Sequence, residues 1–456
     1  MTTFEHDVVI VGAGTAGCYA GATIADAGYD VVIVERKDET EAGHIACGDA
    51  LKGANNFPES IPKSEIDDAF TNTEVDHGQF EIPREDAVLD IPVPGELAVI
   101  DRWEYGRRII DGAERAGTEF HYDTVVQDVI QGDDGRVRGL KANKEGDPRR
   151  YEAEIVLDGA GALSLLQDKA DFSGSTFDTN VRYSQFSSAY REVIEVDEPV
   201  EWSDALVFKP TKRSAGYLWY FPRTETEINV GLGFQMDAEP MTLVQDLRED
   251  ISRRPELQNA TVKDKLGAAL PTRRPYDSAV APGYMAIGDA AAHVNPISGG
   301  GIAGAAYAGQ YAGKQAIEAI EEADPSEDRL WRYNERVMDH FGGRYAALDV
   351  YNIFSTAYDL DDLLALIGAM PGERISEALY SGSAEFDVRL KLRVLYETYG
   401  HWGTLKNLYD AKQLADRLLE HYEEYPSSPD GFASWQAERD GIMDDIYAKT
   451  GAEAKY

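Results

Sequence analysis

The sequence predicts an α/β protein that opens with a Rossmann-type dinucleotide-binding unit. A β-branched run at residues 8–11 leads directly into the glycine-rich residues 12–17, and a second β-branched run follows at residues 31–34. Short apolar runs of this kind are typical of buried parallel strands, and the Ala-rich segment between them predicts a helix. The 43% of hydrophobic residues is spread along all 456 positions, so the chain can bury a sizeable core.

Each glycine of this first unit has a physical role. Gly12 permits a tight turn, Gly14 lets backbone N–H groups approach a pyrophosphate, and Gly17 allows a helix to pack closely on a strand. Glu35 ends the second run, where a carboxylate can accept hydrogen bonds from a ribose diol. The segment therefore predicts an adenine-dinucleotide site, which FAD and NAD satisfy equally well.

Charge and cysteine content narrow the function. The 44 Lys and Arg against 82 Asp and Glu give a net charge of −38, which argues against nucleic acid as a partner. An acidic excess of this size suits a high-salt cytosol, where the Debye length falls to about 3 Å at 1 M, so we expect a halophilic protein. Only Cys18 and Cys47 are present, too few for a disulfide framework or a four-Cys cluster, and we predict no metal site.

A signal peptide and a membrane span are not expected. Residues 1–7 are polar and acidic and lead straight into the first predicted strand. Residues 8–25 and 290–313 are uncharged, but both are crowded with glycine and carry turn motifs. We therefore expect a cytoplasmic protein, with any membrane contact peripheral and on the inner face.

A second segment identifies the cofactor. The apolar run at residues 283–287 ends in Gly288-Asp289, followed by Pro296 and the glycines of residues 299–301. The pattern resembles the second FAD fingerprint of the p-hydroxybenzoate hydroxylase-type flavoproteins. The resemblance implies that Asp289 binds the ribityl chain and that the amides of Gly300, Gly301 and Ile302 face the flavin ring. Residues 299–304 also spell GxGxxG, but no apolar strand precedes them, so we expect no separate NAD(P) domain.

Two further markers of that family recur in this sequence. Arg102 follows Asp101 at the predicted start of a helix, and Asp158 ends the run of residues 155–158. In that family an Arg follows the aspartate that ends this strand, and the corresponding Arg is missing after Asp158. The set of expected FAD contacts is completed by Ala16, Arg36, Ala46, Cys47, Gly48 and Val126.

The reaction is indicated by two other segments. Residues 46–51 contain Cys47-Gly48, and residues 217–222 read Tyr-Leu-Trp-Tyr-Phe-Pro. Together they resemble the geranylgeranyl reductase family, in particular the archaeal members that act on membrane ether-lipid precursors. The resemblance covers residues 5–315 and implies FAD-dependent saturation of C=C bonds in an isoprenoid lipid. It assigns the lipid pocket to Tyr217, Trp219, Phe221 and Pro222, and places Cys47 beside the flavin.

Several alternatives stay open at this point. In a strand, Tyr217, Trp219 and Phe221 share one face, which suits either an isoprenoid chain or an ordinary core. Cys47 is a proton donor or a small residue packed against the flavin. A flavin monooxygenase or hydroxylase, a reductase of a polyprenyl quinone or geranylgeranyl diphosphate, and a lipid carrier with a structural flavin also fit. An electron-transfer flavoprotein–quinone oxidoreductase would need four cysteines, and Tyr217 and Phe221 depart from the halogenase motif.

The domain organisation follows from these placements. We expect a discontinuous FAD-binding domain over residues 1–175 and 270–325, an inserted antiparallel-sheet substrate domain over residues 176–269, and a helical C-terminal subdomain over residues 326–456. The last rests on aromatic and aliphatic residues at helical spacing, and it either packs on itself or forms one wall of a lipid tunnel. The sequence does not identify the electron donor, for which NAD(P)H and a ferredoxin-like protein are the candidates. Cys18, His44 and His293 are expected to be scaffold residues, both histidines with hydrogen bonds.

Overall fold

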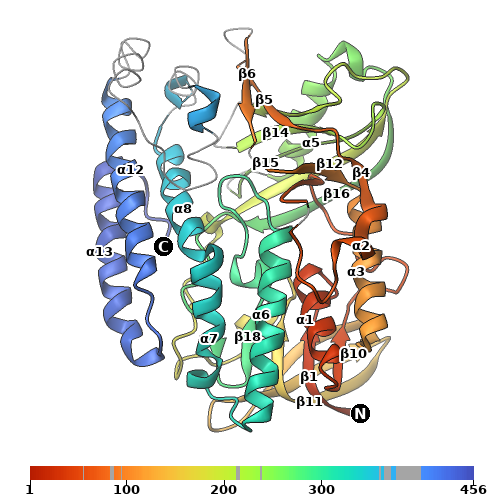
Figure 1. Ribbon diagram of the computed structural model, residues 1–456, viewed down its shortest axis with the longest axis vertical. Helices are drawn as coiled ribbons and strands as arrows, with labels where there is room; N and C mark the ends of the chain where they lie inside the picture. Colours follow the sequence, from red (N-terminus) through yellow and green to blue (C-terminus); the bar gives the residue numbers. More distant parts are fainter. Residues whose placement is uncertain are drawn as a thin grey trace.

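The computed structural model describes residues 1–54, 56–82, 87–93, 95–211, 216–236, 239–358, 361–363, 371–375 and 402–456. Two large sheets lie one above the other in Figure 1, with helices in front of the lower sheet and at one side of the molecule. The predicted α/β class is confirmed. The longer helices are α1 (Thr15–Asp26), α3 (Arg102–Ala116), α5 (Pro240–Ile251), α6 (Ile302–Glu321), α7 (Glu327–Val337), α8 (Gly343–Thr356), α12 (Trp402–Glu423) and α13 (Phe432–Thr450), and the short ones are α2 (Lys63–Ile66) and α4 (Leu165–Lys169).

The lower sheet contains the predicted dinucleotide-binding unit. Its path runs β17-β18-β11-β1-β2-β8, and β11, β1, β2 and β8 are parallel neighbours, as expected for a βαβ arrangement. The β9–β10 ribbon continues antiparallel from β11. The strands are β1 (Thr2–Val11), β2 (Val31–Val34), β8 (Glu119–His121), β9 (Thr124–Gln131), β10 (Val137–Lys144), β11 (Asp147–Asp158), β17 (Val280–Ala281) and β18 (Tyr284–Ala286).

The upper sheet is antiparallel except for one pair, as the inserted substrate domain predicts. Its order is β16-β12-β15-β14-β13-β5-β6, and only β13 and β5 run parallel. Its strands are β5 (His77–Ile82), β6 (Ala87–Pro92), β12 (Phe186–Glu195), β13 (Ala205–Pro210), β14 (Gly216–Pro222), β15 (Glu227–Gln235) and β16 (Thr261–Pro271). A small third sheet joins β3 (Ala50–Lys52), β7 (Leu97–Ile100) and β4 (Phe70–Asn72).

The sheet pairing departs from the expected domain division at one point. β5 and β6 precede residue 176, yet they extend the upper sheet at β13. The register pairs Ala205 with His77 and Phe208 with Phe80. The pairing of β5 with β13 could not be predicted, because parallel pairing between distant segments leaves no local pattern in the sequence. Residues 77–92 therefore belong with the substrate sheet by hydrogen bonding, while the division itself stays a prediction.

The described residues of the last part of the chain lie mainly in the helices α7, α8, α12 and α13. Tyr351 and Phe354 lie on α8, and Tyr358 stacks on Phe354 just beyond its end. Residues 359–360, 364–370 and 376–401 of the expected helical subdomain lie outside the described residues. Within the described part, no helix is long and apolar enough to cross a membrane.

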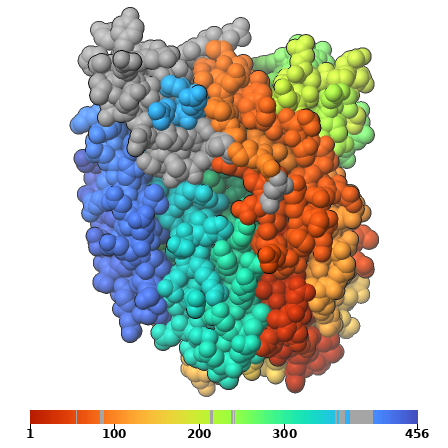
Figure 2. Space-filling view, in the orientation of Figure 1, coloured from red at the N-terminus to blue at the C-terminus, as the bar shows by residue number. Residues whose placement is uncertain are grey.

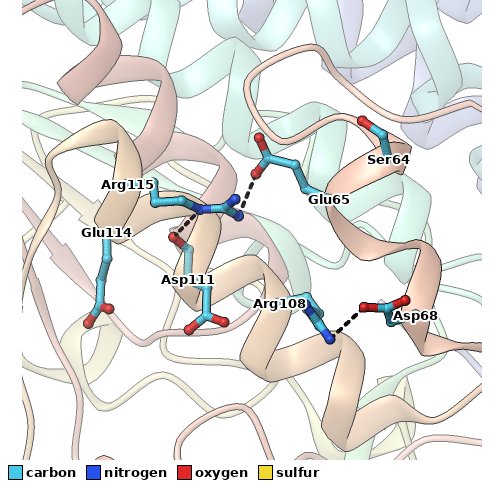
Figure 3. Close-up of a pocket in the computed structure, with 7 residues that line it drawn as sticks. All are labelled: Ser64, Glu65, Asp68, Arg108, Asp111, Glu114 and Arg115. Carbon is cyan, nitrogen blue, oxygen red and sulfur yellow. Dashed lines mark hydrogen bonds and ion pairs between the residues drawn. The ribbon is translucent and has the colours of Figure 1, made fainter.

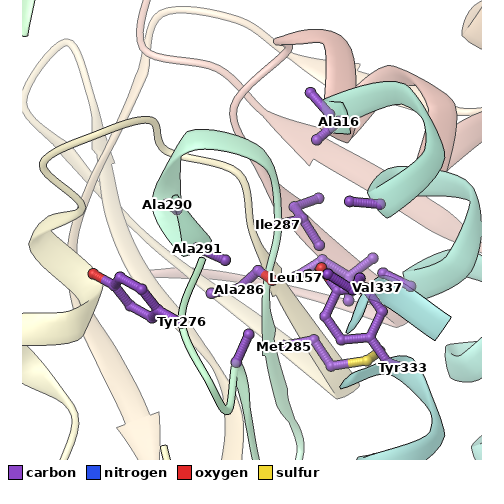
Figure 4. Packing of buried hydrophobic residues seen from close by; sticks show 14 of the residues in the cluster. Ala16, Leu157, Tyr276, Met285, Ala286, Ile287, Ala290, Ala291, Tyr333 and Val337 are labelled. Carbon is purple, nitrogen blue, oxygen red and sulfur yellow. Dashed lines mark hydrogen bonds between the residues drawn. The ribbon is translucent and has the colours of Figure 1, made fainter. Parts of the chain in front are cut away.

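The helices in front of the lower sheet pack with few side-chain atoms between them. A Cβ at Gly309 of α6 would lie 2.2 Å from the carbonyl oxygen of Ala16 on α1, so the two backbones are in direct contact. Figure 4 shows the adjoining core, where Ala16 of α1, Ile287 after β18, and Tyr333 and Val337 of α7 come from three separate segments. Figure 2 shows the same face as a surface, with a hollow between the orange residues that precede α3 and the teal surface of α6 and α8.

His293 differs from the expectation. It is fully buried as scaffold, but neither ring nitrogen has a hydrogen-bond partner among the described residues. Its neighbours are the rings of Tyr333 and Phe341, 6.3 and 5.4 Å away between centroids. The prediction of a hydrogen-bonded histidine was wrong, because an apolar aromatic pocket holds the ring. Burial there lowers the pKa of His293 to about 3.

This histidine makes the fold sensitive to acid. The pKa in the folded state lies below the value of about 6.5 in an unfolded chain, so the neutral ring stabilises the fold above pH 6.5. As pH falls from 6.5 towards 3, the unfolded chain binds a proton first and stability is lost, by about 2 kcal/mol at pH 5. Urea unfolding of wild type and His293→Leu at pH 7 and pH 5 measures this contribution. The variant should lose less stability than wild type between the two values, and equal losses would contradict the assignment.

Candidate active site

Three parallel strands end at one edge of the lower sheet. Val11 of β1 is in register with Asp158 of β11, and Asp158 is in register with Ala286 of β18. The segments that follow these residues therefore meet at a single place, as ligand sites of doubly wound sheets do. The first glycine turn, the Asp158 segment and the Gly288-Asp289 segment are brought together as expected.

The glycine turn is closed by backbone contacts. Gly12 has φ +92, and a Cβ there would lie 2.5 Å from the carbonyl oxygen of Gly159. Gly14, at the N-cap of α1, differs, since a Cβ there would meet only Ile45 Cδ1, at 4.0 Å. No protein group in the described residues fills the space at Gly14, and no side chain caps α1. An uncapped helix N-terminus with open space before it fits a pyrophosphate.

Glu35 supports this turn. Its carboxylate accepts hydrogen bonds from the backbone N–H groups of Ala13 (2.8 Å) and Lys37 (2.9 Å). The carbonyl of Glu35 accepts from Thr124 N, which places the start of β9, and with it the half-buried Val126, beside the end of β2. Arg36 is exposed. Glu35 and Val126 thus lie on the side of the unit where a dinucleotide's adenosine half is expected.

Arg102 is a buried cation without a matching anion. It begins α3 after the Asp101 N-cap and is only 4% exposed. Its guanidinium makes two long hydrogen bonds, to Gly43 O at 3.5 Å and Thr15 Oγ1 at 3.4 Å. Among the residues described, no carboxylate comes within ion-pair distance of it. Because a buried charge is costly unless paired, this guanidinium fits the negative charge of a bound dinucleotide.

Asp289 is the complementary acceptor. It follows β18 and is half-buried, and its carboxylate accepts no hydrogen bond from any described residue. Burial raises the pKa of Asp289 to about 6, opposed by the nearby Arg102 charge. The glycines at the start of α6 face it, since a Cβ at Gly301 would lie 3.5 Å from Asp289 Oδ1. Gly301 and Ile302 therefore bring uncapped N–H groups next to a carboxylate that suits ribityl hydroxyls, while the N–H of Gly300 donates to Ser298 Oγ at 3.4 Å.

The resemblance implies that Asp158 contacts FAD, whereas in the structure its carboxylate is bonded to protein groups. Its oxygens accept from Ser164 Oγ at 2.5 Å, Ala160 N at 3.1 Å and the hydroxyl of Tyr284. It is fully buried, and burial raises its pKa. Its lone pairs are occupied by the protein, so the geometry supports a role in shaping the end of β11.

The Cys-Gly segment packs on the aromatic strand. A Cβ at Gly48 would lie 3.3 Å from Phe221 Cε2 and 3.4 Å from Trp219 Cε2. Tyr217, Trp219 and Phe221 all face this side of β14, as predicted, whereas Leu218 and Tyr220 pack into the opposite core. The hydroxyl of Tyr217 donates to Ser298 O at 2.6 Å, in the loop before α6. The strand thus joins the Cys-Gly segment to the second FAD segment, and Pro222 ends it.

Cys47 lies half-buried at this junction, with Ala46 beside it. Its Sγ accepts a hydrogen bond from Asp49 N at 3.3 Å. Burial raises the pKa of the Cys47 thiol, the Asp49 charge raises it further, and Arg102 opposes both. The thiol form is therefore favoured. Cys18 is fully buried in α1 and contacts Ala13 O, as expected of a scaffold residue.

Three residues of the site, Asp49, Arg223 and Asn229, were not predicted to belong to it. Asn229 of β15 donates to Cys47 O at 2.9 Å and to Asp49 Oδ2 at 2.6 Å, and it accepts from Trp219 Nε1 at 2.9 Å. Arg223 pairs with Asp49 at 2.7 Å. A sequence signal existed for Asn229, because it is the one polar side chain in the run Ile-Asn-Val-Gly-Leu of residues 228–232. His44, by contrast, is hydrogen-bonded as predicted, to Asp264 Oδ2 at 2.9 Å.

A charged groove of about 640 Å³ lies elsewhere, on the outer face of α2 and α3 (Figure 3). Arg108 pairs there with Asp68 at 2.7 Å and Arg115 with Glu65 at 2.8 Å. Its lining is Ser64, Glu65, Asp68, Arg108, Asp111, Glu114 and Arg115. None of these residues belongs to the segments that meet at the strand ends, so this groove is separate from the candidate active site.

The fold and the site define a flavoprotein of the two-segment FAD-binding class. The model of the FAD binding domain family matches residues 5–340. A digeranylgeranylglycerophospholipid reductase of Sulfolobus acidocaldarius is 26% identical over 97% of this chain and 98% of its own. Digeranylgeranylglycerophospholipid reductase 2 of Methanopyrus kandleri is 30% identical over 81% of this chain and 92% of its own. The chain therefore belongs to the digeranylgeranylglycerophospholipid reductase family within the FAD-binding flavoproteins.

A solved structure agrees with this fold. A geranylgeranyl bacteriochlorophyll reductase-like protein from Thermoplasma acidophilum superposes with a TM-score of 0.73, at 23% identity, over 90% of this chain and 100% of that protein. The predicted cofactor, FAD, is confirmed by the family, and the predicted fold class is confirmed by the family and by this neighbour.

Proposed function

We propose that this protein is an FAD-dependent reductase that saturates C=C bonds of geranylgeranyl chains in archaeal ether-lipid precursors. The observation that carries the proposal is the junction at β14, where the aromatic strand contacts both the Cys-Gly segment and the second FAD segment. The relatives named digeranylgeranylglycerophospholipid reductase support the substrate class. When bound, reduced FAD supplies a hydride equivalent.

FAD would be held by groups whose hydrogen-bonding capacity the described residues leave partly unused. The N–H groups at Gly14 and the Arg102 guanidinium would take the pyrophosphate, and Asp289 the ribityl hydroxyls. Glu35, already braced by two backbone N–H groups, keeps lone pairs for a ribose diol. The N-terminus of α6 at Ile302 would face the flavin ring.

Cys47 would supply the proton for the second alkene carbon. Saturation adds a hydride to one carbon and a proton to the other, so the protein needs an acid near the chain. The Cys47 thiol is held protonated by its surroundings, lies beside Trp219 and Phe221 through Gly48, and can regain its proton from solvent because it is half-buried. The aromatic side chains would orient the alkene and exclude water from it.

Two partners are proposed in coarser terms. The described chain has one dinucleotide-binding unit, so NAD(P)H or a ferredoxin-like reductant would reach the flavin through a shared cleft. With a net charge of −38, contact with a bilayer would be peripheral and hydrophobic. Among the exposed apolar side chains is Trp103, whose ring stacks on His44.

Product analysis tests the substrate class. Holoenzyme with excess dithionite should raise the mass of digeranylgeranylglyceryl phosphate by two hydrogens per bond. A polyprenyl quinone and geranylgeranyl diphosphate serve as competing substrates, and faster saturation of either would replace the lipid in the proposal. Oxygen uptake with NAD(P)H and an aromatic substrate, without any saturation of lipid, would instead identify a monooxygenase.

A further inference from the structure

Asp49 is a buried acid next to Cys47 that the proposed chemistry has not used. It is 0% exposed and adopts φ +71, a backbone conformation that aspartate and asparagine tolerate better than most residues. This conformation turns the chain back, so the N–H of Asp49 reaches Cys47 Sγ at 3.3 Å. The Cys-Gly-Asp segment therefore forms a tight turn around the thiol.

The Asp49 carboxylate is held by two residues of the upper sheet. Its Oδ2 accepts from Arg223 Nε at 2.8 Å, Arg223 Nη2 at 2.7 Å and Asn229 Nδ2 at 2.6 Å. Its Oδ1 is buried and has no partner in the described part of the chain. Burial raises the pKa of Asp49, and the Arg223 charge opposes this most strongly. The direct contacts of Oδ2 with the Arg223 guanidinium and the Asn229 amide favour the charged carboxylate.

Asn229 ties this turn to the aromatic strand. The same amide that binds Asp49 donates to Cys47 O and accepts from the indole of Trp219. Asn229 is fully buried and all of these bonds lie between 2.6 and 2.9 Å. Movement of the Cys-Gly-Asp turn relative to Trp219 would therefore break buried hydrogen bonds, which is costly.

Charged groups face Cys47 from several elements. Arg102 comes from α3 and Arg191 from β12, and both favour the thiolate. Tyr217 of β14 lies within electrostatic reach, but its hydroxyl is bonded to Ser298 O and stays neutral, since burial raises its pKa. Asp49 is the group that favours the thiol form. Without the Asp49 charge, burial alone would oppose the effect of the two arginines on the thiol.

We propose that Asp49 is a positioning residue for Cys47, held by Arg223 and Asn229 so that the thiol stays protonated and stays against the aromatic strand. The catalytic role of Asp49 rests on the proposed function, in which Cys47 donates a proton and must therefore enter the reaction as a thiol. The position and charge state of Cys47 can nevertheless be measured without any lipid.

The test is alkylation of Cys47 in the holoenzyme. Wild type and Asp49→Asn are treated with iodoacetamide between pH 7 and 10, and the Cys47 peptide is quantified by mass spectrometry, separately from the Cys18 peptide. Removing the Asp49 charge should move the midpoint of the rate profile about one unit lower, which is about tenfold faster alkylation at pH 8. The rate at high pH should stay the same, because a loosened turn would change that plateau and a lost charge would not.

Asp250→Asn is the matched control. Asp250 is also buried, also paired with an arginine, and bonded to Tyr220, but it lies in α5 rather than at Cys47. Its variant should leave the midpoint unchanged. Asp49→Ser removes the same charge and keeps a hydroxyl acceptor, so it decides the question if Asp49→Asn does not fold. An unchanged midpoint in a folded Asp49 variant overturns the proposal.

Turnover separates this inference from the proposed function. If Cys47 is the proton donor, the alkaline limb of the kcat profile in Asp49→Asn should shift to lower pH together with the alkylation midpoint. A shifted midpoint with an unshifted kcat profile would support the role of Asp49 and contradict Cys47 as donor. If the wild-type protein does not saturate the lipid at all, only the proposed function is contradicted, because the alkylation experiment does not depend on lipid saturation.

Discussion

Replacing Cys47 with alanine is expected to lower kcat for lipid saturation by about 10²- to 10⁴-fold while FAD stays bound. Loss of a positioned general acid removes stabilisation from the transition state only, so KM for the lipid should change little. The alanine is smaller than the thiol, and the half-buried position leaves the Gly48 contacts with Trp219 and Phe221 in place. Steady-state kinetics, with flavin content checked by absorbance, measures the effect.

Cys18→Ala provides the control for this substitution. Cys18 is the other thiol of the sequence, fully buried in α1 and bonded only to a backbone carbonyl. The Cys18→Ala variant should keep a near-normal kcat, and it is compared with Cys47→Ala at equal flavin content. Near-normal turnover in Cys47→Ala would contradict the acid role and leave Cys47 as a packing residue.

Replacing Arg102 with methionine should have opposite effects on cofactor binding and on the stability of the FAD-free protein. The variant loses charge-assisted hydrogen bonds to the dinucleotide, each worth about 1.5–3 kcal/mol, so Kd for FAD should rise at least 10- to 100-fold. The FAD-free protein, however, loses a buried cation that, among the described residues, has two long hydrogen bonds to neutral groups and a contact with the Tyr105 ring but no ion pair. Its melting temperature should therefore rise.

Arg223→Met gives the matched comparison. Arg223 is buried to a similar degree, but it pairs with Asp49, Asp101 and Glu227. Its removal leaves the buried Asp49 carboxylate without its cation, so the melting temperature should fall. Flavin fluorescence titration and thermal melts of the FAD-free proteins measure both quantities. A destabilised FAD-free Arg102→Met protein would contradict the view that Arg102 awaits a cofactor anion.

The cofactor half of the site could be predicted from the sequence because its signals are local. Gly12, Gly14 and Gly17 follow a strand directly; Gly17 contacts Gly12 and Gly14 leaves space for a ligand, whereas the contact of Gly12 with Gly159 forms only when β1 and β11 pair. The Gly288-Asp289 segment likewise follows its own strand. Parallel strands then bring these segments together without further information, since their carboxyl ends share one edge of the sheet.

The other half depends on contacts between distant segments, which no local pattern reveals. Asn229 and Arg223 reach Asp49 across about 180 positions of sequence, and β5 joins the upper sheet beside β13 in a parallel pair. Asp158 fitted the family pattern by its position at the end of a strand, but its hydrogen-bond partners Ser164 and Tyr284 could be identified only in three dimensions. His293 was expected to be bonded because most buried histidines are, and here aromatic rings surround it.

The most direct measurement is an anaerobic single turnover in high salt. The purified protein is reduced with one equivalent of dithionite per flavin, mixed with digeranylgeranylglyceryl phosphate, and followed by flavin absorbance and lipid mass together. For a geranylgeranyl reductase we expect the flavin to reoxidise without oxygen and one C=C bond per flavin to gain two hydrogens. A flavin that stays reduced until air is admitted, with lipid mass unchanged, would contradict the central claim that this protein reduces geranylgeranyl chains.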